Sequence, residues 1–423
     1  MLMKLPMKET LLMVALAVTL LLLIQVMGTA YGVRVLVEAS CYAIIALGLT
    51  IQWGYAGLFN AGIMGFVALG GFSAMLLTFP VNQGFWESDL SGELGMAFMK
   101  LLAAVLLVAA VMQLHRISVP RRIRLPIILI VLASVYLWVV NAFAPVSQSI
   151  VSEHGFIGGL GLPVWAGWLV GGILAGTLAY FIGHICLGLR SDYLAIATLG
   201  VAEIIKAFLK NSDWLTRGTL TVSPLPWPVP GAGDVGFIMG RALYLSVTAV
   251  LIAIIFYLLH QAYKGPWGRM MRAIRDNELS SAAMGKNVNQ RRLEVFVLGC
   301  VLMGIGGAAL ATFNGIFDPT GYLPLNHTFL IWVMVILGGP GNNMGTIFGA
   351  VFVYVIWVMS EPIALFILNG ISYLGDMWFA WEAPSDFTSR ALQARVFTIG
   401  LIITLVLRYA PKGLFPEKIQ QHH

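Results

Sequence analysis

A strongly basic segment contains the residues of this sequence that are best suited to bind a partner. Residues 263–292 carry seven basic side chains. Apolar side chains recur there at the spacing of one helix face: Trp267, Met270, Met271 and Ile274. Three arginines project elsewhere: Arg269, Arg272 and Arg275. Pro266 suits a first helical turn and Gly285 a left-handed cap, so we predict one basic amphipathic helix between them. Such a helix binds either anionic lipid headgroups or a groove in another protein.

Polar side chains inside apolar runs form a second group of candidate residues. An Asp, Lys or Arg at the centre of a membrane helix costs about +2.5 to +3.5 kcal/mol, so it should face other helices or water. Glu203 and Lys206 lie one turn apart, where they can neutralise each other or contact a solute. Weaker candidates for a solute path lie near the ends of apolar runs: Asn60, Asp192, Tyr193, Asn314 and His327. The Gly-rich stretch around Asn60, Gly54 to Gly71, is a candidate broken helix.

Common catalytic motifs are absent from the sequence. It contains no GxxxxGK[ST] loop for ATP, no HExxH, no GxSxG and no dinucleotide fingerprint. The histidines are scattered, and three cysteines lie in apolar runs without paired spacing: Cys41, Cys186 and Cys300. These cysteines are predicted to be small buried hydrophobes. We therefore expect no enzymatic site, no cofactor and no metal.

Composition indicates that membrane helices position these residues. Of 423 residues, 59% are hydrophobic and 10% are charged, and the mean hydropathy is +0.87, whereas soluble domains carry about 25% charged residues. The fold class expected is all-α, a single transmembrane bundle of about ten to twelve spans over residues 1–423. Candidate spans are Leu11–Ile24, Val33–Gln52, Phe59–Phe79, Ala97–Leu114, Pro126–Ala144, Pro163–Leu187, Tyr193–Leu209, Leu243–His260, Leu293–Phe313, Phe329–Leu337, Thr346–Leu368 and Val396–Leu407.

Three features of individual spans qualify this scheme. The first span follows Lys4 and Lys8 as a signal peptide would, but a second apolar run follows at once, so we predict an uncleaved helix. Phe329–Leu337 is short and ends in a Gly-rich block, which leaves open whether it spans or re-enters the membrane. Several spans contain GxxxG pairs, which permit close helix contacts: Gly167 with Gly171, Gly172 with Gly176, and Gly345 with Gly349.

The positions of basic residues predict the orientation of the bundle. When the twelve spans alternate, one side collects residues 263–292, the loop His115–Arg124 and the tail with Lys412 and Lys418. That side is predicted to be cytoplasmic and to include both termini. The other side collects the loops Asn211–Gly240 and Asn369–Arg390, including an extended proline-rich stretch at Ser223–Gly231. The net charge of +6 is thus explained by membrane orientation, and we expect no nucleic-acid partner.

Four blocks carry a resemblance to a known family. They are GPWGRMMRAIRDNELSSAAMGKNVNQRRLEVFVLG from Gly265, LGLRSDYLAIATLGVAEIIKAFLKN from Leu187, VILGGPGNNMGTIFGA, and the tail from Ala410 to Pro416. With these blocks the sequence resembles the LivM-type permeases of branched-chain amino acid ABC transporters, over about Tyr42–Phe79 and Pro163–Phe415. Residues 80–162 have no counterpart in that resemblance, and we predict that they form an additional helical hairpin. Asn277 stands where the family usually has an acid, and Asn369–Arg390 is a further insertion.

The resemblance implies a transport subunit without its own ATPase site. It implies a bacterial inner-membrane protein that works with two ATP-binding subunits, a second LivH-type permease and an extracytoplasmic solute-binding protein. In that family a short cytoplasmic helix docks in a cleft of the ATP-binding subunit. The positions here that match this coupling loop, 263–292, are Trp267, Arg269, Arg272, Arg275, Glu278, Ala283 and Gly285. The arginines are expected to pair with acidic groups of the partner.

Other functions are compatible with parts of this pattern. Urea or short amides are alternative solutes, because relatives with a similar loop are linked to them. From another class, an ion-coupled secondary transporter would also suit twelve spans. It would require coupling carboxylates deep in several spans, and only Glu203 meets that condition.

Overall fold

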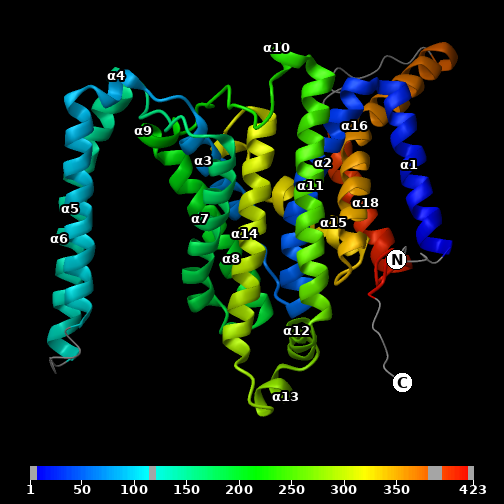
Figure 1. The fold of residues 1–423 in the computed structure, drawn as a ribbon. Coiled ribbons are helices and arrows are strands. Elements are labelled where there is room, and N and C mark those ends of the chain that lie inside the picture. The colour runs from blue at the N-terminus through cyan, green and yellow to red at the C-terminus, as the bar shows by residue number, and fades with distance from the viewer. Residues whose placement is uncertain (1–6, 114–120, 380–392, 418–423) are drawn as a thin grey trace.

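The regular elements of the described chain are helices, apart from two isolated β-bridges. The computed structural model describes residues 7–113, 121–379 and 393–417 (Figure 1). The first half contains α1 (Met7–Met27), α2 (Thr29–Leu49), η1 (Thr50–Tyr55), α3 (Ile63–Thr78), α4 (Gln83–Trp86), α5 (Asp89–Met112), α6 (Arg121–His154), α7 (Val164–Cys186), α8 (Ser191–Asn211) and α9 (Asp213–Thr216). The second half contains α10 (Ala232–Val235), α11 (Phe237–Lys264), α12 (Pro266–Asp276), α13 (Glu278–Ala283), α14 (Val288–Asn314), η3 (Pro319–Gly321), η4 (Leu325–Phe329), α15 (Leu330–Gly338), α16 (Asn343–Phe379) and α18 (Ala394–Tyr409).

The predicted all-α bundle is confirmed, and each of the twelve candidate spans coincides with a helix. Among the described residues, eight helices are long and apolar enough to cross a membrane: those at Glu9–Met27, Thr29–Tyr55, Asp89–Met112, Pro126–His154, Val164–Cys186, Phe237–Lys264, Val288–Asn314 and Asn343–Leu374. Two shorter apolar helices cover Ile63–Thr78 and Asn326–Gly338. The η4 segment has five residues and α15 has nine, so the two together are roughly 20 Å long. The hydrocarbon core of a bilayer is about 30 Å thick. This segment is therefore too short to span as one helix.

The bundle core is built on glycines where four helices meet. Helix α14 lies among α2, α3 and α7 (Figure 1). A Cβ atom at Gly70 of α3 would overlap the carbonyl oxygen of Gly304 in α14, and Gly304 in turn lies against the Gly171 carbonyl of α7. Gly307 abuts the backbone of Val67 in the same way. Because van der Waals packing replaces the hydrophobic effect inside a bilayer, these close backbone contacts hold the four helices together.

A break between η1 and α3 confirms the predicted broken helix around Asn60. Helix α2 is buried along most of its length and ends in the π-helical turn η1. Regular α-helix resumes only at Ile63, so the predicted start at Phe59 was four residues too early. Gly57 adopts a positive φ of 67°, which a residue with a Cβ rarely adopts. The chain therefore reverses here inside the bundle.

The predicted outer loop at Asn369–Arg390 was wrong in its first half. Helix α16 continues through 37 residues to Phe379 without a break at Pro362. Residues 380–390 lie outside the described part of the chain, as does most of the predicted loop His115–Arg124. The Ser223–Gly231 stretch is non-helical, as predicted. Leu225 donates its N–H to the Gly315 carbonyl at 2.9 Å, and Trp227 stacks on Phe313 with centroids 5.7 Å apart, so the stretch is fixed to the end of α14.

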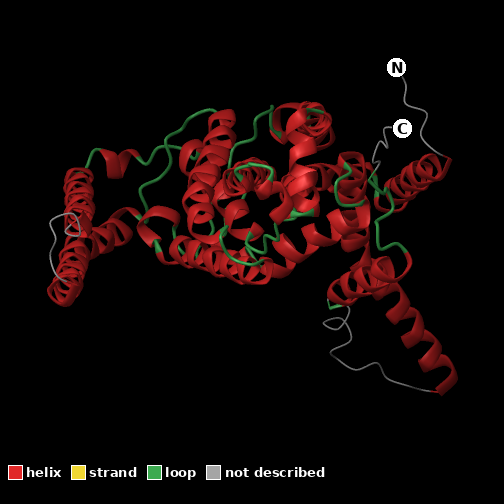
Figure 2. Cartoon of the chain, turned by 90° about the horizontal axis from the view of Figure 1, so that it is seen from below, coloured by secondary structure: helices red, strands yellow, loops and turns green. Residues whose placement is uncertain are grey.

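Helices α5 and α6 form a hairpin that stands beside the bundle (Figures 1 and 2). Within residues 80–162 the chain is thus hairpin-shaped, and that this hairpin is additional to the family stays a prediction. At its base, an isolated β-bridge pairs Val81 with Gly158, and the Trp214 carbonyl accepts the Ile157 N–H at 3.0 Å. A small apolar cluster fills this base: Phe85, Leu94, Val146, Ile150 and Ile157. Beyond the base, large apolar side chains such as Leu102 and Leu106 are exposed.

Basic segments gather at one end of the bundle. Helices α12 and α13 lie at the lower end in Figure 1, and α4 and α10 lie at the upper end. Glu417 of the C-terminal tail contacts Arg275 of α12, so the described end of the chain also lies at the lower end. This arrangement matches the predicted grouping of the basic segments, and the assignment of that end to the cytoplasm stays a prediction.

Candidate functional site

The basic loop folds into two short helices instead of the single helix predicted. Helix α12 begins with Pro266 in its first turn, as predicted, and ends at Asp276. Asn277 then adopts an extended conformation with φ −155°, and its side-chain oxygen accepts the Ser280 N–H at 2.9 Å. Asparagine is a preferred N-cap because its side chain satisfies a free amide of the first turn. The cap starts α13, and Gly285 beyond it has the predicted left-handed φ of 76°.

The apolar face of α12 is directed into the protein. Met271 and Ile274 are buried, whereas Arg269 is exposed. Trp267 is half-buried and lies edge-on to Tyr55 of η1, with ring centroids 6.4 Å apart. The amphipathic pattern therefore seats α12 on the end of η1, and Met271 and Ile274 are not available to an outside groove.

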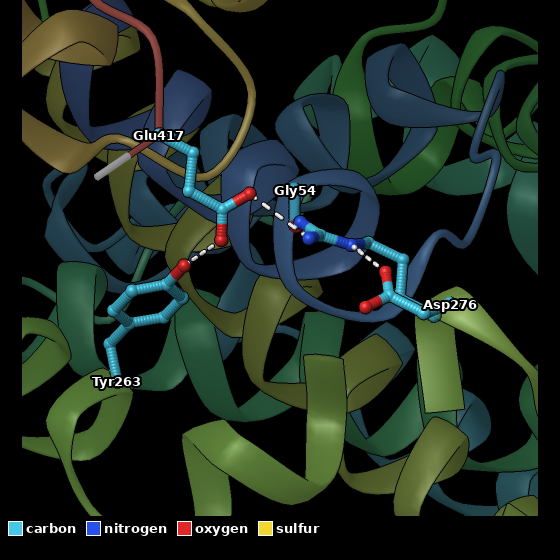
Figure 3. A network of polar contacts seen from close by, with 5 residues as sticks. Gly54, Tyr263, Asp276 and Glu417 are labelled. Atoms are coloured by element: carbon cyan, nitrogen blue, oxygen red, sulfur yellow. Dashed lines mark hydrogen bonds and ion pairs between the residues drawn. The ribbon is translucent and has the colours of Figure 1, made fainter. Parts of the chain in front are cut away.

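All three arginines contact groups of this chain, but Arg269 does so only through a 3.4 Å donation to the Lys264 carbonyl and stays exposed. Arg275 donates to the Gly54 carbonyl and forms ion pairs with Glu417 at 3.0 Å and Asp276 at 3.4 Å (Figure 3). Burial lowers the pKa of Arg275 while the Glu417 and Asp276 carboxylates raise it, and the net shift is upward. Arg272 covers the ring of Tyr263 at 4.4 Å. The expected pairing with a partner's acids is thus open to Arg269, while Arg275 already has acidic partners.

The exposed surface of the loop is on α13. Leu279 is 84% exposed and Met284 is 81% exposed, and Ala283 and Gly285 are also exposed. Glu278 pairs with Arg292 of α14 at 2.8 Å, which fixes the start of α13. A groove of about 340 Å³ runs between the two short helices, and its lining residues are Met270, Ala273, Asp276, Asn277, Ser280, Ser281, Met284 and Lys286. Exposed apolar side chains beside a groove, at the end of a membrane bundle, form a surface suited to another protein.

Asn60 holds the broken helix together. Its side-chain amide donates to Gln52 of η1 at 2.9 Å, its side-chain oxygen accepts the Gly62 N–H at 2.8 Å, and its carbonyl accepts the indole N–H of Trp332 at 3.0 Å. Gln52 in turn donates to the Phe296 carbonyl in α14 at 2.8 Å. Asn60 is fully buried, so this network ties η1, α14 and α15 together at the break.

The other candidate path residues are not brought together. Asp192, Tyr193 and Glu203 are exposed and Lys206 half-buried on α8, and Asn314 is exposed at the far end of α14. Of the two possibilities left open for Glu203 and Lys206, the ion pair with each other is not formed within the described residues, and contact with a solute stays a prediction. His327 lies in η4 near the rings of Tyr322 and Tyr42, with centroids 5.3 and 6.2 Å apart. Its buried Nδ1 has no hydrogen-bond partner in the described chain.

A buried carboxylate, Glu38, was not among the predicted site residues. Glu38 of α2 is 7% exposed, accepts from the Tyr354 hydroxyl at 2.6 Å and pairs with Arg34 at 3.1 Å. The signal available was the i,i+4 spacing of Arg34 and Glu38 within an apolar run. The carboxylate links α2 to α16. The three cysteines are buried and free, as predicted.

The chain is similar in sequence to known permease proteins. The chain is 25% identical over 241 residues to the high-affinity branched-chain amino acid transport system permease protein LivM of Escherichia coli (strain K12), covering 52% of this chain and 56% of that protein. It is 26% identical over 253 residues to the probable branched-chain amino acid transport permease protein LivM of Methanocaldococcus jannaschii, covering 58% and 67%. The alignment therefore spans little more than half the length of the first of these relatives.

A more distant likeness joins the chain to another permease. It is 25% identical over 122 residues to the ribose import permease protein RbsC of Haemophilus influenzae, covering 28% of this chain and 37% of that protein. No solved structure matches the chain. The family described as branched-chain amino acid transport system / permease component matches residues 31–366, which run from the start of α2 through the basic loop to most of α16. The chain therefore belongs to the family of branched-chain amino acid transport system permease components.

Proposed function

We propose that this chain is a permease subunit of an ATP-driven importer for branched-chain amino acids in the bacterial inner membrane. Family membership and the names of the two LivM relatives support these solutes over urea or short amides. The family match likewise does not favour an ion-coupled secondary transporter. No P-loop is present in the sequence, so the energy must come from two ATP-binding partner subunits. An extracytoplasmic solute-binding protein would supply the solute.

The exposed surface of α13 is the observation that carries this proposal. Leu279 and Met284 are large apolar side chains held outward at the basic end of the bundle, beside a groove. Apolar residues that protrude from a basic surface are typical anchors for a protein partner. We assign α13 and the exposed Arg269 of α12 to the ATP-binding subunit, with Ala283 and Gly285 leaving a narrow tip that enters its cleft.

The contacts of α12 provide a route from this surface to the membrane helices. Trp267 packs against Tyr55, and Arg275 holds the Gly54 carbonyl, so α12 is fixed to η1 at two points. From η1, Gln52 reaches Asn60 and α14. Single π-helical turns are frequent at functional sites because their looser hydrogen bonding permits rearrangement. A displacement of α12 by the partner would therefore be transmitted to the break between η1 and α3.

A second permease subunit would complete the solute path along α8. Glu203 is exposed near the middle of α8, where lipid contact would cost about +2.5 to +3.5 kcal/mol for a comparable charged residue. The exposed face of α8 is therefore expected to meet protein or a water-filled path. A LivH-type subunit on this face would enclose Asp192, Tyr193, Glu203 and Lys206, which is how these residues would come to line the path. An apolar amino acid requires few fixed charges there.

A pair of substitutions at the tip of α13 tests the assignment of the loop. The variant Leu279→Asp with Met284→Asp should reduce ATP-driven leucine uptake in proteoliposomes by about ten-fold or more, because desolvated apolar anchors are lost. The ATP-binding subunits should fail to co-purify with it. The control is Leu220→Asp, which changes a side chain of the outer loop that is 62% exposed. Normal uptake and co-purification by the double variant would contradict the proposal.

A further inference from the structure

The C-terminal tail returns to the bundle and pairs with α15. After α18, the Leu414 N–H donates to the Leu337 carbonyl at 2.8 Å and the Phe415 N–H donates to the Gly338 carbonyl at 3.1 Å. Phe415 is fully buried and lies 4.9 Å from the Phe348 ring of α16. A Cβ atom on Gly413 would overlap Gly339, so the tail and the α15–α16 turn are in backbone contact. The tail is therefore a fixed part of the α15–α16 unit.

Beyond this anchor, Glu417 reaches the coupling loop. Its carboxylate accepts the hydroxyl of Tyr263 at the end of α11 and forms the 3.0 Å ion pair with Arg275 of α12 (Figure 3). The side chains of Glu417 and Arg275 are only 14% and 22% exposed. Partial burial makes such an ion pair less screened by salt than a surface pair. Glu417 therefore connects α11 and α12 to the tail.

The guanidinium of Arg275 is the point where three segments meet. It belongs to α12, it donates to the Gly54 carbonyl of η1, and it pairs with Glu417 of the tail. Its remaining carboxylate partner, Asp276, is its chain neighbour and is 70% exposed. Without Glu417, α12 would still reach α16 through Tyr55, which donates to Asn343 at 2.7 Å, but would lose its charged link to the tail that pairs with α15.

We propose that Glu417 is a positioning residue that fixes the angle of α12 relative to η1 and the α15–α16 turn. This inference rests on the proposed role of the loop as the contact with the ATP-binding subunit. The tail then acts as a strut, because its backbone is hydrogen-bonded to α15 while its carboxylate holds Arg275. Movement imposed on α12 by the partner reaches the α15–α16 unit through this strut as well as reaching η1 directly. Loss of the carboxylate leaves docking intact and weakens the transmission of movement.

The test compares uptake with ATP hydrolysis in the purified complex. Glu417→Gln keeps the shape and an acceptor for Tyr263 but removes the charge that holds Arg275. We expect the leucine transported per ATP hydrolysed to fall about five-fold, because α12 is no longer held by a charged partner. The ATP-binding subunits should co-purify as with the natural chain. Glu294→Gln is the matched control, because Glu294 is also a paired glutamate, bound to Arg291 at 2.8 Å away from the tail.

A charge exchange tests whether Glu417 acts through its ion pair with Arg275. Arg275→Glu alone should lower the transport ratio, and Arg275→Glu combined with Glu417→Arg should restore the part that depends on the ion pair but not the part that depends on the donation to the Gly54 carbonyl. An unchanged transport ratio in Glu417→Gln would overturn the inference, as would a fall in the ratio matched by Glu294→Gln. If the ATP-binding subunits did not bind the natural chain at all, the proposed function itself would fail, and that result is distinguishable from either outcome.

Discussion

Two segments extend from the bundle, and they are attached in different ways. The α12–α13 loop is held by contacts to η1, α11, α14 and the C-terminal tail, through Trp267, Arg272, Arg275 and Glu278. The α5–α6 hairpin is held at its base, where Val81 pairs with Gly158 and Trp214 lies about 6 Å from the rings of Phe98 and Phe143. A segment that transmits movement needs several fixed contacts, whereas one surrounded by lipid needs only its own backbone hydrogen bonds satisfied. The loop has the several fixed contacts of a segment that transmits movement, and the hairpin has the few contacts of a segment surrounded by lipid.

The largest expected loss of stability and uptake comes from a substitution at Gly54 of η1, where α12 contacts the bundle. A Cβ atom at Gly54 would lie 2.5 Å from the Gly341 nitrogen, which is backbone and cannot move aside cheaply. Gly54→Val should therefore destabilise the protein by about 3 kcal/mol and abolish uptake. In the hairpin, a Cβ atom at Gly95 of α5 meets nothing within 4 Å, so Gly95→Val should leave both properties unchanged.

The stability of the two glycine variants is measured by thermal unfolding in detergent, and their activity by leucine uptake in proteoliposomes. Equal stability and equal uptake for Gly54→Val and Gly95→Val would show that the loop rests on the bundle no more tightly than the hairpin does.

A difference of intermediate size is expected between the crosslinking partners of two exposed helix faces, one on α8 and one on α5. Ile204 of α8 is 68% exposed and Leu106 of α5 is 63% exposed, but only α8 carries charges nearby. The natural cysteines are all buried, so a cysteine introduced at either position is the accessible thiol. A thiol-directed photo-crosslinker should join Ile204→Cys to the second permease subunit, while Leu106→Cys should join mainly lipid. Equal yields of protein adduct would remove the distinction between the two faces.

Excision of the hairpin should have the smallest effect. The β-bridge between Val81 and Gly158 keeps the two ends of this segment together. Replacement of residues 83–155 by a short Gly-Ser linker should therefore leave leucine uptake within about two-fold of the natural level, since few buried contacts outside the base are lost. A complete loss of uptake, with the rest of the chain still in the membrane, would give the hairpin a part in transport.

Local patterns in the sequence were sufficient for much of the fold. Apolar runs predicted the helices because the bilayer requires each spanning backbone to satisfy its own hydrogen bonds. Pro266 at the start of α12 and the left-handed Gly285 follow from single-residue conformational preferences. The length of α16 was underestimated because Asn369 and Gly370 suggest a loop, whereas the helix continues past them.

Contacts between distant segments were not predictable in this way. Asn277 interrupts the basic helix because its side chain caps α13, a local signal that the apolar spacing obscured. Glu417 and Arg275 are 142 positions apart (417 − 275), and no periodicity relates them. Glu38 with Tyr354, and Asn60 with Trp332, likewise depend on how the helices pack. The candidate coupling residues were found from the sequence, but the inward direction of Arg275 required the structure.

Contact between the α13 tip and an ATP-binding subunit is the central claim of the proposed function. A thiol-directed photo-crosslinker attached at Leu279→Cys, in the assembled transporter, tests this claim directly because the natural cysteines are buried. We predict an adduct with an ATP-binding subunit, and none when the crosslinker is attached at Leu220→Cys on the outer loop. An adduct of Leu279→Cys with lipid or the solute-binding protein alone would contradict the claim.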